Sequence, residues 1–265
     1  MADQRRNANR HYSLENSFYV VEAYSIIGTC DKQEDVFECV EQDMGMVLVL
    51  CDGMGGLGNG RVAAEKAVSE IKQFALEQDW KSNPREFLRK AIEIADEEVY
   101  FLKNPEGKQL RAGCTVLIAL IAGRKVYYAN VGDSRIYYYD GNCLSQVTQD
   151  HNYGEQLERQ LKCGEITREI YEREQSKAAA LTGYLGLGEI KERYIAEEPI
   201  LLDRNHVLCL QSDGLYKLLS EKEMLEIIAR NPKDLSRVGE GLLQKADEKK
   251  SSYQDNTSII LLRLK

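Results

Sequence analysis

The sequence predicts an α+β fold in which mainly antiparallel β-sheets are flanked by helices. Strand-like segments come first, followed by two helices, more strands, two further helices and a last strand. Neighbouring strand-like segments are joined by short turns, whereas a parallel sheet would alternate each strand with a helix. The chain has 265 residues, of which 43% are hydrophobic, so it can bury a large core as one domain.

The first part of the chain combines a polar start with three strands. Residues 1–16 are polar, and we expect them to form a flexible N-terminal arm, which leaves residues 17–265 as the single folded domain. Residues 17–28 are rich in β-branched and aromatic side chains, which is typical of a strand. Two more strands are predicted over 36–40 and 44–51, joined by a short polar turn.

Two helices are predicted next. Residues 61–78 place small and apolar side chains, including Ala67 and Ile71, at helical spacing. In the second helix, Asn83 can cap the first turn and Pro84 suits the first helical position. We expect this second helix to end at about Leu102.

The second half of the chain returns to strands. Four strand-like runs lie between residues 113 and 147, separated by turn sequences, and they predict an antiparallel meander. Residues 151–190 are polar and helical in composition without a strong amphipathic pattern, so we expect a surface segment. The remaining predicted elements are a strand in 206–214, helices over 221–230 and 234–249, and a strand in 256–264.

Composition and charge exclude several classes of function. The net charge of −8 argues against nucleic-acid binding, which requires a cationic surface. The seven cysteines are scattered and never spaced C-x-x-C, so they predict neither a disulfide framework nor a zinc site. The N-terminus has no secretory signal and no apolar run approaches the ~18 residues of a transmembrane helix, so we expect a cytoplasmic protein without membrane partners.

Acidic residues recur at the ends of the predicted strands. A single Asp-Gly pair is best explained as a turn, but the whole set would concentrate negative charge at one end of the sheets. Hard divalent ions such as magnesium or manganese prefer oxygen ligands of this kind. The pattern therefore predicts a site for two such ions, built from oxygen ligands. Its members are Glu34, Asp35, Asp52, Asp133, Asp213 and Asp255.

Four motifs in order resemble the metal-dependent serine/threonine protein phosphatases of the 2C class. They are "VLVLCDGMGG" (47–56), "CTVLIALIAGRKVYYANVGDSRIYYY" (114–139), "LCLQSDGLYKLLS" (208–220) and "DNTSIILLRL" (255–264). Met54, the sequence Gln-Glu-Asp at 33–35, and a flap-like segment at 157–167 are similar to the bacterial branch of that family. The resemblance covers roughly residues 20–264.

The resemblance implies two stacked β-sheets with helices on both outer faces and a flap at about 151–190. It also implies roles for single residues. Asp52 would bridge two manganese or magnesium ions and, with Asp213, act in catalysis through a metal-bound water. Asp35 and Asn256 would orient the ligands. The implied ligands are Glu34 and the Gly53 carbonyl for one metal, Asp213 and Asp255 for the other, and Asp133 with Asp213 for a possible third.

The implied activity is hydrolysis of phosphoserine and phosphothreonine in proteins, by a monomer that opposes a bacterial serine/threonine kinase. One position departs from the family, because Cys30 stands where an arginine usually binds the substrate phosphate, and Lys32 is a possible replacement contact. Two alternatives therefore stay open: a weakly active or non-catalytic phosphoprotein-binding relative, and an enzyme for small phosphomonoesters. The complete set of acids favours the protein phosphatase.

Overall fold

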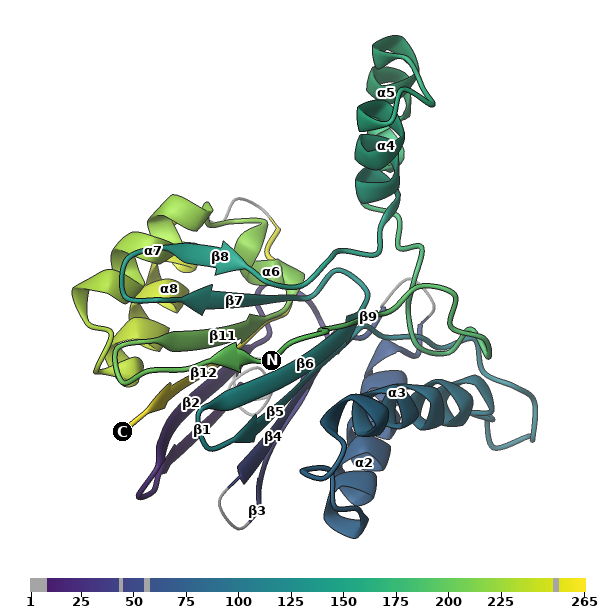
Figure 1. Cartoon of the computed structure of the whole chain (residues 1–265). Helices are drawn as coiled ribbons and strands as arrows, with labels where there is room; N and C mark the ends of the chain where they lie inside the picture. Colours follow the sequence, from purple (N-terminus) through teal and green to yellow (C-terminus); the bar gives the residue numbers. More distant parts are fainter. Residues whose placement is uncertain (1–8, 43–44, 55–57, 250–252) are drawn as a thin grey trace.

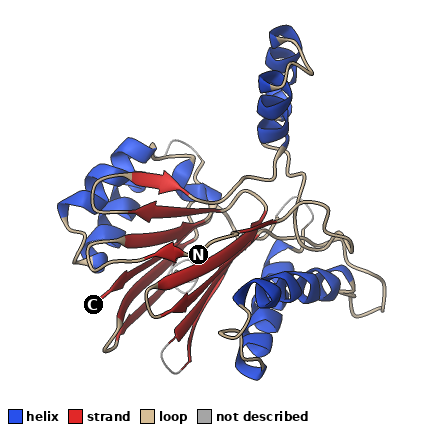
Figure 2. Cartoon of the chain, in the orientation of Figure 1, coloured by secondary structure: helices blue, strands red, loops and turns tan. Residues whose placement is uncertain are grey.

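The computed structural model describes the chain except residues 1–8, 43–44, 55–57 and 250–252. Two antiparallel sheets of six strands are stacked on each other, and helices cover both outer faces (Figures 1 and 2). The predicted α+β sandwich is therefore confirmed.

The first sheet has the strand order β1-β2-β12-β11-β7-β8 and the second β10-β6-β5-β4-β3, with β9 paired to β6. The strands of the first sheet are β1 (Arg10–Glu15), β2 (Tyr19–Ile26), β12 (Thr257–Leu264), β11 (Val207–Gln211), β7 (Arg135–Tyr139) and β8 (Leu144–Gln146). The strands of the second are β10 (Ile200–Leu201), β6 (Lys125–Val131), β5 (Val116–Ala122), β4 (Gly45–Cys51), β3 (Val36–Gln42) and β9 (Tyr194–Ile195). All strand pairs within the described residues are antiparallel, as the short connections indicated.

The helices form two outer layers and a projecting hairpin (Figure 1). Asn83 caps α3 by accepting a hydrogen bond from the Glu86 N–H, and Pro84 opens that helix, as predicted. The helix pair on the second sheet is α2 (Gly60–Glu77) and α3 (Pro84–Tyr100). Those on the first sheet are α6 (Asp213–Tyr216), α7 (Glu221–Arg230) and α8 (Leu235–Lys249). The hairpin contains α4 (Tyr153–Lys162), α5 (Arg168–Glu174) and the short 3₁₀ turn η2 (Gln175–Lys177).

Three apolar cores hold the four layers together. The central core lies between the sheets and includes Leu48, Leu117 and Leu210, all fully buried. The other two lie between each sheet and its helices. Strand β4 is buried along its whole length because one face packs on the other sheet and one on α2, which explains its uninterrupted apolar sequence.

The predicted flexible arm is wrong over Arg10–Glu15, which form strand β1 along β2. Tyr12 and Leu14 pack against the central core, while His11 and Ser13 on the opposite face contact Glu22, each at 2.7 Å. Only every second residue of this edge strand meets the core, so its polar composition hid it. Residues 1–8 lie outside the described part of the chain.

The predicted single meander is also wrong, because β5 and β6 belong to the second sheet whereas β7 and β8 belong to the first. The chain crosses between the sheets at Gly132, Asp133 and Ser134. Gly132 has a φ of +101°, and a Cβ there would lie 2.6 Å from Cγ2 of Thr115. The crossing therefore requires glycine and places Asp133 between the two sheets.

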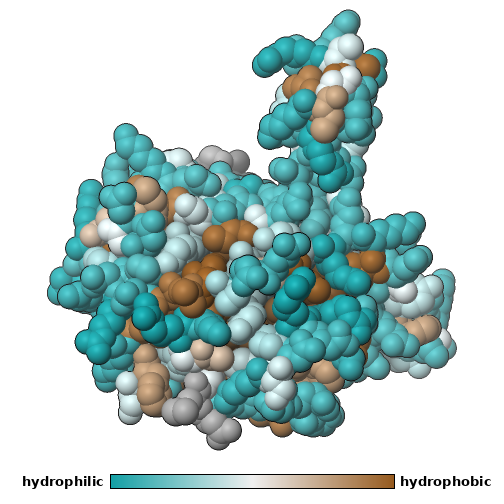
Figure 3. Space-filling view, in the orientation of Figure 1, coloured by the Kyte–Doolittle hydropathy of each residue, from teal (hydrophilic) through white to brown (hydrophobic). Residues whose placement is uncertain are grey.

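The visible face of the molecule is mainly hydrophilic, with apolar side chains grouped in the middle of the body and on the projecting hairpin (Figure 3). Within the hairpin, Leu157 of α4 is buried, while α5 has no buried residue. The hairpin therefore gains little from burial and extends into solvent, which agrees with the predicted surface segment. Among the described residues, no helix combines the length and apolar character needed to cross a membrane.

Candidate metal centre

Strand directions bring the predicted acids to one end of the sandwich. Strands β4 and β6 run the same way because both are antiparallel to β5, so Asp52 and Asp133 leave the second sheet at the same end. In the first sheet, Asp213 follows β11 and Asp255 precedes its antiparallel partner β12, which places them side by side. Convergence at a strand end, which the sequence alone could only assume, follows from this topology.

The electrostatics of Asp52 show that these carboxyl groups interact. Burial, together with the surrounding negative charges, raises the pKa of Asp52 well above its usual range. The carboxyl groups of Asp52 and Asp213 are also within hydrogen-bonding reach of each other. Without a bound cation, a shared proton is the simplest way to relieve this repulsion. The charges that act on Asp52 come from Asp35, Asp213, Asp133 and Asp255.

The backbone of Asp52 is held by Thr115, at the start of the neighbouring strand. The Thr115 N–H donates to the Asp52 carbonyl (2.8 Å), and the Asp52 N–H donates to Thr115 Oγ1 (3.1 Å). The Thr115 hydroxyl also lies 2.7 Å from the hydroxyl of Ser134, which is fully buried beside Asp133. The hydroxyl groups of Thr115 and Ser134 thus connect the backbone of Asp52 to the turn that carries Asp133. Both hydroxyl residues lie inside the quoted motifs, but their role was not predicted.

The segment that carries Glu34 is fixed by Asn256. The Glu34 N–H donates to Asn256 Oδ1 (2.7 Å), and Asn256 Nδ2 donates to the carbonyls of Ile27 (2.9 Å) and Lys32 (3.0 Å). Asp35, which is 2% exposed, accepts a 2.8 Å hydrogen bond from Ser212 Oγ, next to Asp213. Both residues predicted to orient the ligands therefore bridge the Glu34 segment and the first sheet. The side chain of Lys32 is exposed.

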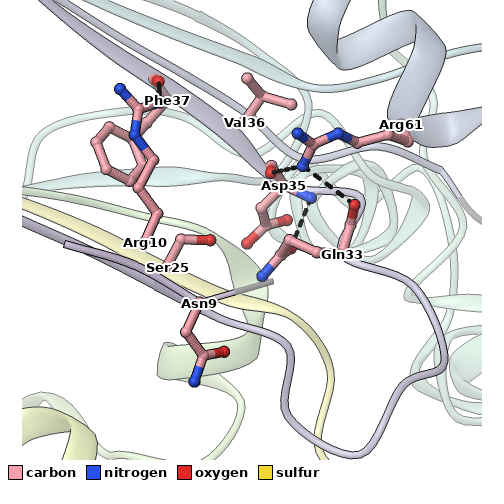
Figure 4. Close-up of a pocket in the computed structure, with 8 residues that line it drawn as sticks. All are labelled: Asn9, Arg10, Ser25, Gln33, Asp35, Val36, Phe37 and Arg61. Atoms are coloured by element: carbon pink, nitrogen blue, oxygen red, sulfur yellow. Dashed lines mark hydrogen bonds between the residues drawn. The ribbon is translucent and has the colours of Figure 1, made fainter. Parts of the chain in front are cut away.

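A pocket of about 380 Å³ borders the segment that carries Glu34 and is lined in part by Gln33, Asp35 and Arg61 (Figure 4). Arg61 of α2 donates from Nη1 to the carbonyls of Gln33 and Asp35, each at 3.2 Å. The segment is therefore anchored from α2 as well as from Asn256.

Gly53 is required by packing. A Cβ at this position would lie 2.4 Å from the backbone carbon of Gly60 and 2.8 Å from the Glu34 carbonyl oxygen. The end of β4, the start of α2 and the Glu34 segment consequently meet backbone to backbone. The sequence had suggested a role only for the Gly53 carbonyl, as a metal ligand.

Helix α6 places a lysine among the acids. Lys217 lies one turn after Asp213, and its Nζ contacts Asp213 Oδ2. Burial alone would lower the pKa of Lys217, but the carboxylates of Asp213, Asp133 and Asp52 raise it above its usual value. The sequence analysis missed this residue, although its spacing of four from Asp213 was a visible signal.

The far side of α6 is held by an arginine. The guanidinium carbon of Arg135 lies 3.7 Å from the ring centroid of Tyr216, and Arg135 pairs with the buried Asp150 at 2.8 Å. Tyr216 in turn forms a side-chain hydrogen bond to Asp133. These contacts, also missed by the sequence analysis, position α6 relative to the Asp133 turn.

The base of the flap contacts the same turn. The backbone N–H of Gly132 donates to the ring Nδ1 of His151 (3.1 Å). The backbone N–H of His151 donates in return to the Gly132 carbonyl (3.0 Å). Burial lowers the pKa of His151, which keeps the ring neutral so that Nδ1 can accept this bond. The flap and Asp133 are therefore joined through Gly132.

Cys30, at the predicted phosphate-binding position, faces the acids. Its Sγ lies 3.4 Å from Asp255 Oδ1, and burial together with that negative charge raises the pKa of the thiol. All seven cysteines are free. A protonated thiol is a weak nucleophile, so Cys30 is unsuited to attack a phosphate.

The donor set suits hard divalent cations, because it consists of carboxylate and carbonyl oxygens that repel one another without a cation. Among the described residues, no group of three or more His, Cys, Asp or Glu side chains is arranged so that it could hold a metal ion. Magnesium typically binds one or two carboxylates and keeps several waters, so a centre of water-rich ions does not need such a group.

Acidification is expected to stabilise the metal-free protein. Burial raises the pKa of Asp35 to about 7 and of Asp133 to about 6, so the folded state binds more protons than the unfolded state above pH 3.8. The free energy of unfolding should therefore fall by a few kcal/mol as pH rises from about 4 to about 7. Urea unfolding in EDTA across this range checks it; a stability that is flat or rises with pH would contradict the crowding of these acids.

Comparison with known proteins identifies the family. The protein phosphatase 2C family model matches residues 35–255. The serine/threonine phosphatase Stp of Listeria monocytogenes is 30% identical over 232 residues, which cover 86% of this chain and 87% of that protein. The crystal structure of Stp1 from Staphylococcus aureus is 26% identical with a TM-score of 0.77, covering 97% of this chain and 98% of that one.

A third relative shares the fold at lower identity. The catalytic domain of the phosphatase PstP, solved in complex with two manganese ions, superimposes with a TM-score of 0.73 at 21% identity and covers 93% of this chain and 98% of that one. The family match spans the acid-bearing segments from Asp35 to Asp255. The chain thus belongs to the protein phosphatase 2C family and is a serine/threonine protein phosphatase, a hydrolase of phosphoproteins.

Proposed function

We propose that this phosphatase works at a centre of two manganese or magnesium ions held by the acids at the end of the sandwich. The crowding around Asp52 carries the proposal, because four other carboxylates raise its pKa by their charge in addition to burial. PstP, which shares the fold, contains two manganese ions in its solved structure. Two such ions, when bound, activate a water and hold phosphate oxygens for in-line displacement.

The chain's own residues divide the work of binding. Asp52 lies among the other acids and would contact both ions. Glu34 with the Gly53 carbonyl would hold one ion, and Asp213 with Asp255 would hold the other. Thr115, Asn256 and Asp35 hold the backbone segments that carry these ligands, which keeps the ligand geometry rigid.

The protein supplies no covalent nucleophile in this proposal. The thiol of Cys30 is protonated and faces Asp255, while burial raises the pKa of Cys39 and Cys209 to about 12. In this proposal water displaces the serine or threonine oxygen from phosphorus, which gives the free hydroxyl of that residue and inorganic phosphate.

Substrates and partners follow from the same chemistry. We expect phosphoserine and phosphothreonine proteins as substrates, a cognate serine/threonine kinase as the source of those phosphates, and a cytoplasmic monomer. The projecting hairpin α4–α5 and the exposed Lys32 are the candidate contacts for substrate.

Metal dependence tests the proposal directly. Hydrolysis of a phosphothreonine peptide is measured with manganese, with magnesium and with EDTA, and a phosphotyrosine peptide of the same sequence serves as the matched substrate. We expect turnover of the phosphothreonine peptide with either metal and loss of turnover in EDTA that added manganese reverses. Turnover that persists in EDTA would contradict the metal centre.

Replacing Cys30 by arginine is expected to lower KM for a phosphothreonine peptide about 3- to 10-fold, because a guanidinium fork binds phosphate more strongly than the thiol or a distant Lys32 ammonium. The kcat should change little, since the metal ligands are kept. Steady-state kinetics at saturating metal measure both constants. Cys143→Arg, at an exposed cysteine of the β7–β8 turn, is the matched control. An unchanged KM in Cys30→Arg would contradict a phosphate-binding role for this position.

A further inference from the structure

Lys217 is a basic side chain whose charge acts on three of the proposed ligand acids. Its Nζ contacts Asp213, and its charge also acts on Asp133 and Asp52. Asp133 and Asp213 are the pair that the family resemblance assigns to a third metal ion. The ammonium group thus contacts one of the two acids that would hold that third ion, and its charge acts on the other.

The position of Lys217 is built into the fold. Leu215 and Leu219, on the other side of this turn, are buried in the core beneath the first sheet. Tyr216 is held between the Arg135 guanidinium and the Asp133 carboxyl. Because Leu215, Tyr216 and Leu219 hold the backbone on both sides of Lys217, the lysine reaches Asp213 by extending its stem, and 50% of its side chain stays exposed.

Charge balance favours the ammonium over a third divalent ion. The five proposed ligand carboxylates, at Glu34, Asp52, Asp133, Asp213 and Asp255, carry five negative charges. Two divalent ions and one ammonium group neutralise this set. A third divalent ion beside Lys217 would meet a like charge at close range, and the repulsion between like charges rises as their separation falls.

We propose that Lys217 is a tethered cation that replaces the third metal ion, so that this phosphatase binds two divalent ions and the ammonium group completes the charge between Asp133 and Asp213. This inference rests on the proposed two-metal function. In this proposal Lys217 sets the number of divalent ions that the protein binds, and that number can be measured without measuring turnover.

The test counts manganese ions by equilibrium dialysis with metal analysis, and locates them by anomalous scattering in crystals soaked with manganese. Wild type should bind two ions. Lys217→Met, which keeps the aliphatic stem, should bind a third ion beside Asp133 at least about 10-fold more tightly than wild type does. Lys217→Arg keeps the charge and should bind two. Lys222→Met, at an exposed lysine of α7, is the matched control and should also bind two.

Each outcome decides between the inference and the function on which it rests. Three ions in wild type, or no gain in the third affinity in folded Lys217→Met, would overturn the role of Lys217 and leave the two-metal phosphatase intact. A third ion in Lys217→Arg would also overturn it, because the charge would then not be the cause. Wild-type protein that binds no manganese would overturn both.

Discussion

Replacing Asp52 by asparagine is expected to reduce turnover of a phosphothreonine peptide by on the order of 10³-fold or more. Asparagine has nearly the shape of aspartate and keeps one acceptor oxygen, so the hydrogen bonds of the Asp52 backbone to Thr115 should persist. The lost negative charge is one on which four other carboxylates act, and in the proposed centre it would contact both cations. Losing a few kcal/mol of stabilisation there corresponds to this fall in rate.

The same substitution should increase the stability of the metal-free protein, although it reduces turnover. In EDTA at pH 7, Asp52→Asn removes the repulsion that raises the pKa of Asp52, so its free energy of unfolding should exceed that of wild type. Manganese should then stabilise wild type more than the variant, because binding to the folded state alone adds to stability.

Peptide hydrolysis and urea unfolding, each with manganese and with EDTA, measure both effects. Asp140→Asn is the matched control, since Asp140 is an exposed turn residue whose Oδ1 accepts from the N–H groups of Asn142 and Cys143. We expect this control to keep wild-type activity. If Asp52→Asn retained more than about a tenth of wild-type turnover, the central role of this carboxylate would be wrong.

The fold was predictable where local pattern and tertiary role coincide. Strand β4 is apolar throughout because both of its faces are buried, and α7 spans the predicted residues 221–230 because its serine cap and apolar face mark both ends. Strand β1 escaped prediction because only alternate residues meet the core. The supposed meander failed because strand periodicity does not show which sheet a strand joins, and Gly132 redirects the chain between sheets.

The candidate site shows the same division. Acids at strand ends are visible in the sequence, and antiparallel pairing then brings them together. Thr115, Ser134 and Lys217 could not be assigned in this way, because their roles depend on which side chains face them across the sandwich. The metal-binding role of the Gly53 carbonyl stays a prediction, whereas the close contact of Gly53 with Gly60 is tertiary and could not be read from the sequence.

Replacing Gly53 by alanine is expected to destabilise the protein by about 3 kcal/mol and to reduce turnover at least about 100-fold. The added Cβ would lie 2.4 Å and 2.5 Å from the carbon and oxygen of the Gly60 backbone and 2.8 Å from the Glu34 carbonyl oxygen. These are backbone atoms of a helix start and of an anchored segment, so no flexible side chain can move aside. The methyl group must push α2 away from β4 or displace the segment that carries Glu34, and either movement misplaces a proposed ligand.

Gly241→Ala makes the same chemical change at a permissive position and serves as the control. Gly241 lies in α8, and its added Cβ would meet a side-chain methyl of Ile227 at 3.1 Å, while the helix gains up to about 1 kcal/mol from alanine. We expect its stability within about 1 kcal/mol of wild type and unchanged turnover. Urea unfolding and peptide hydrolysis of both variants separate close packing at Gly53 from a general effect of glycine replacement. Equal behaviour of the two variants would show that the junction of β4, α2 and the Glu34 segment can yield, and that close packing is not the reason for a glycine at position 53.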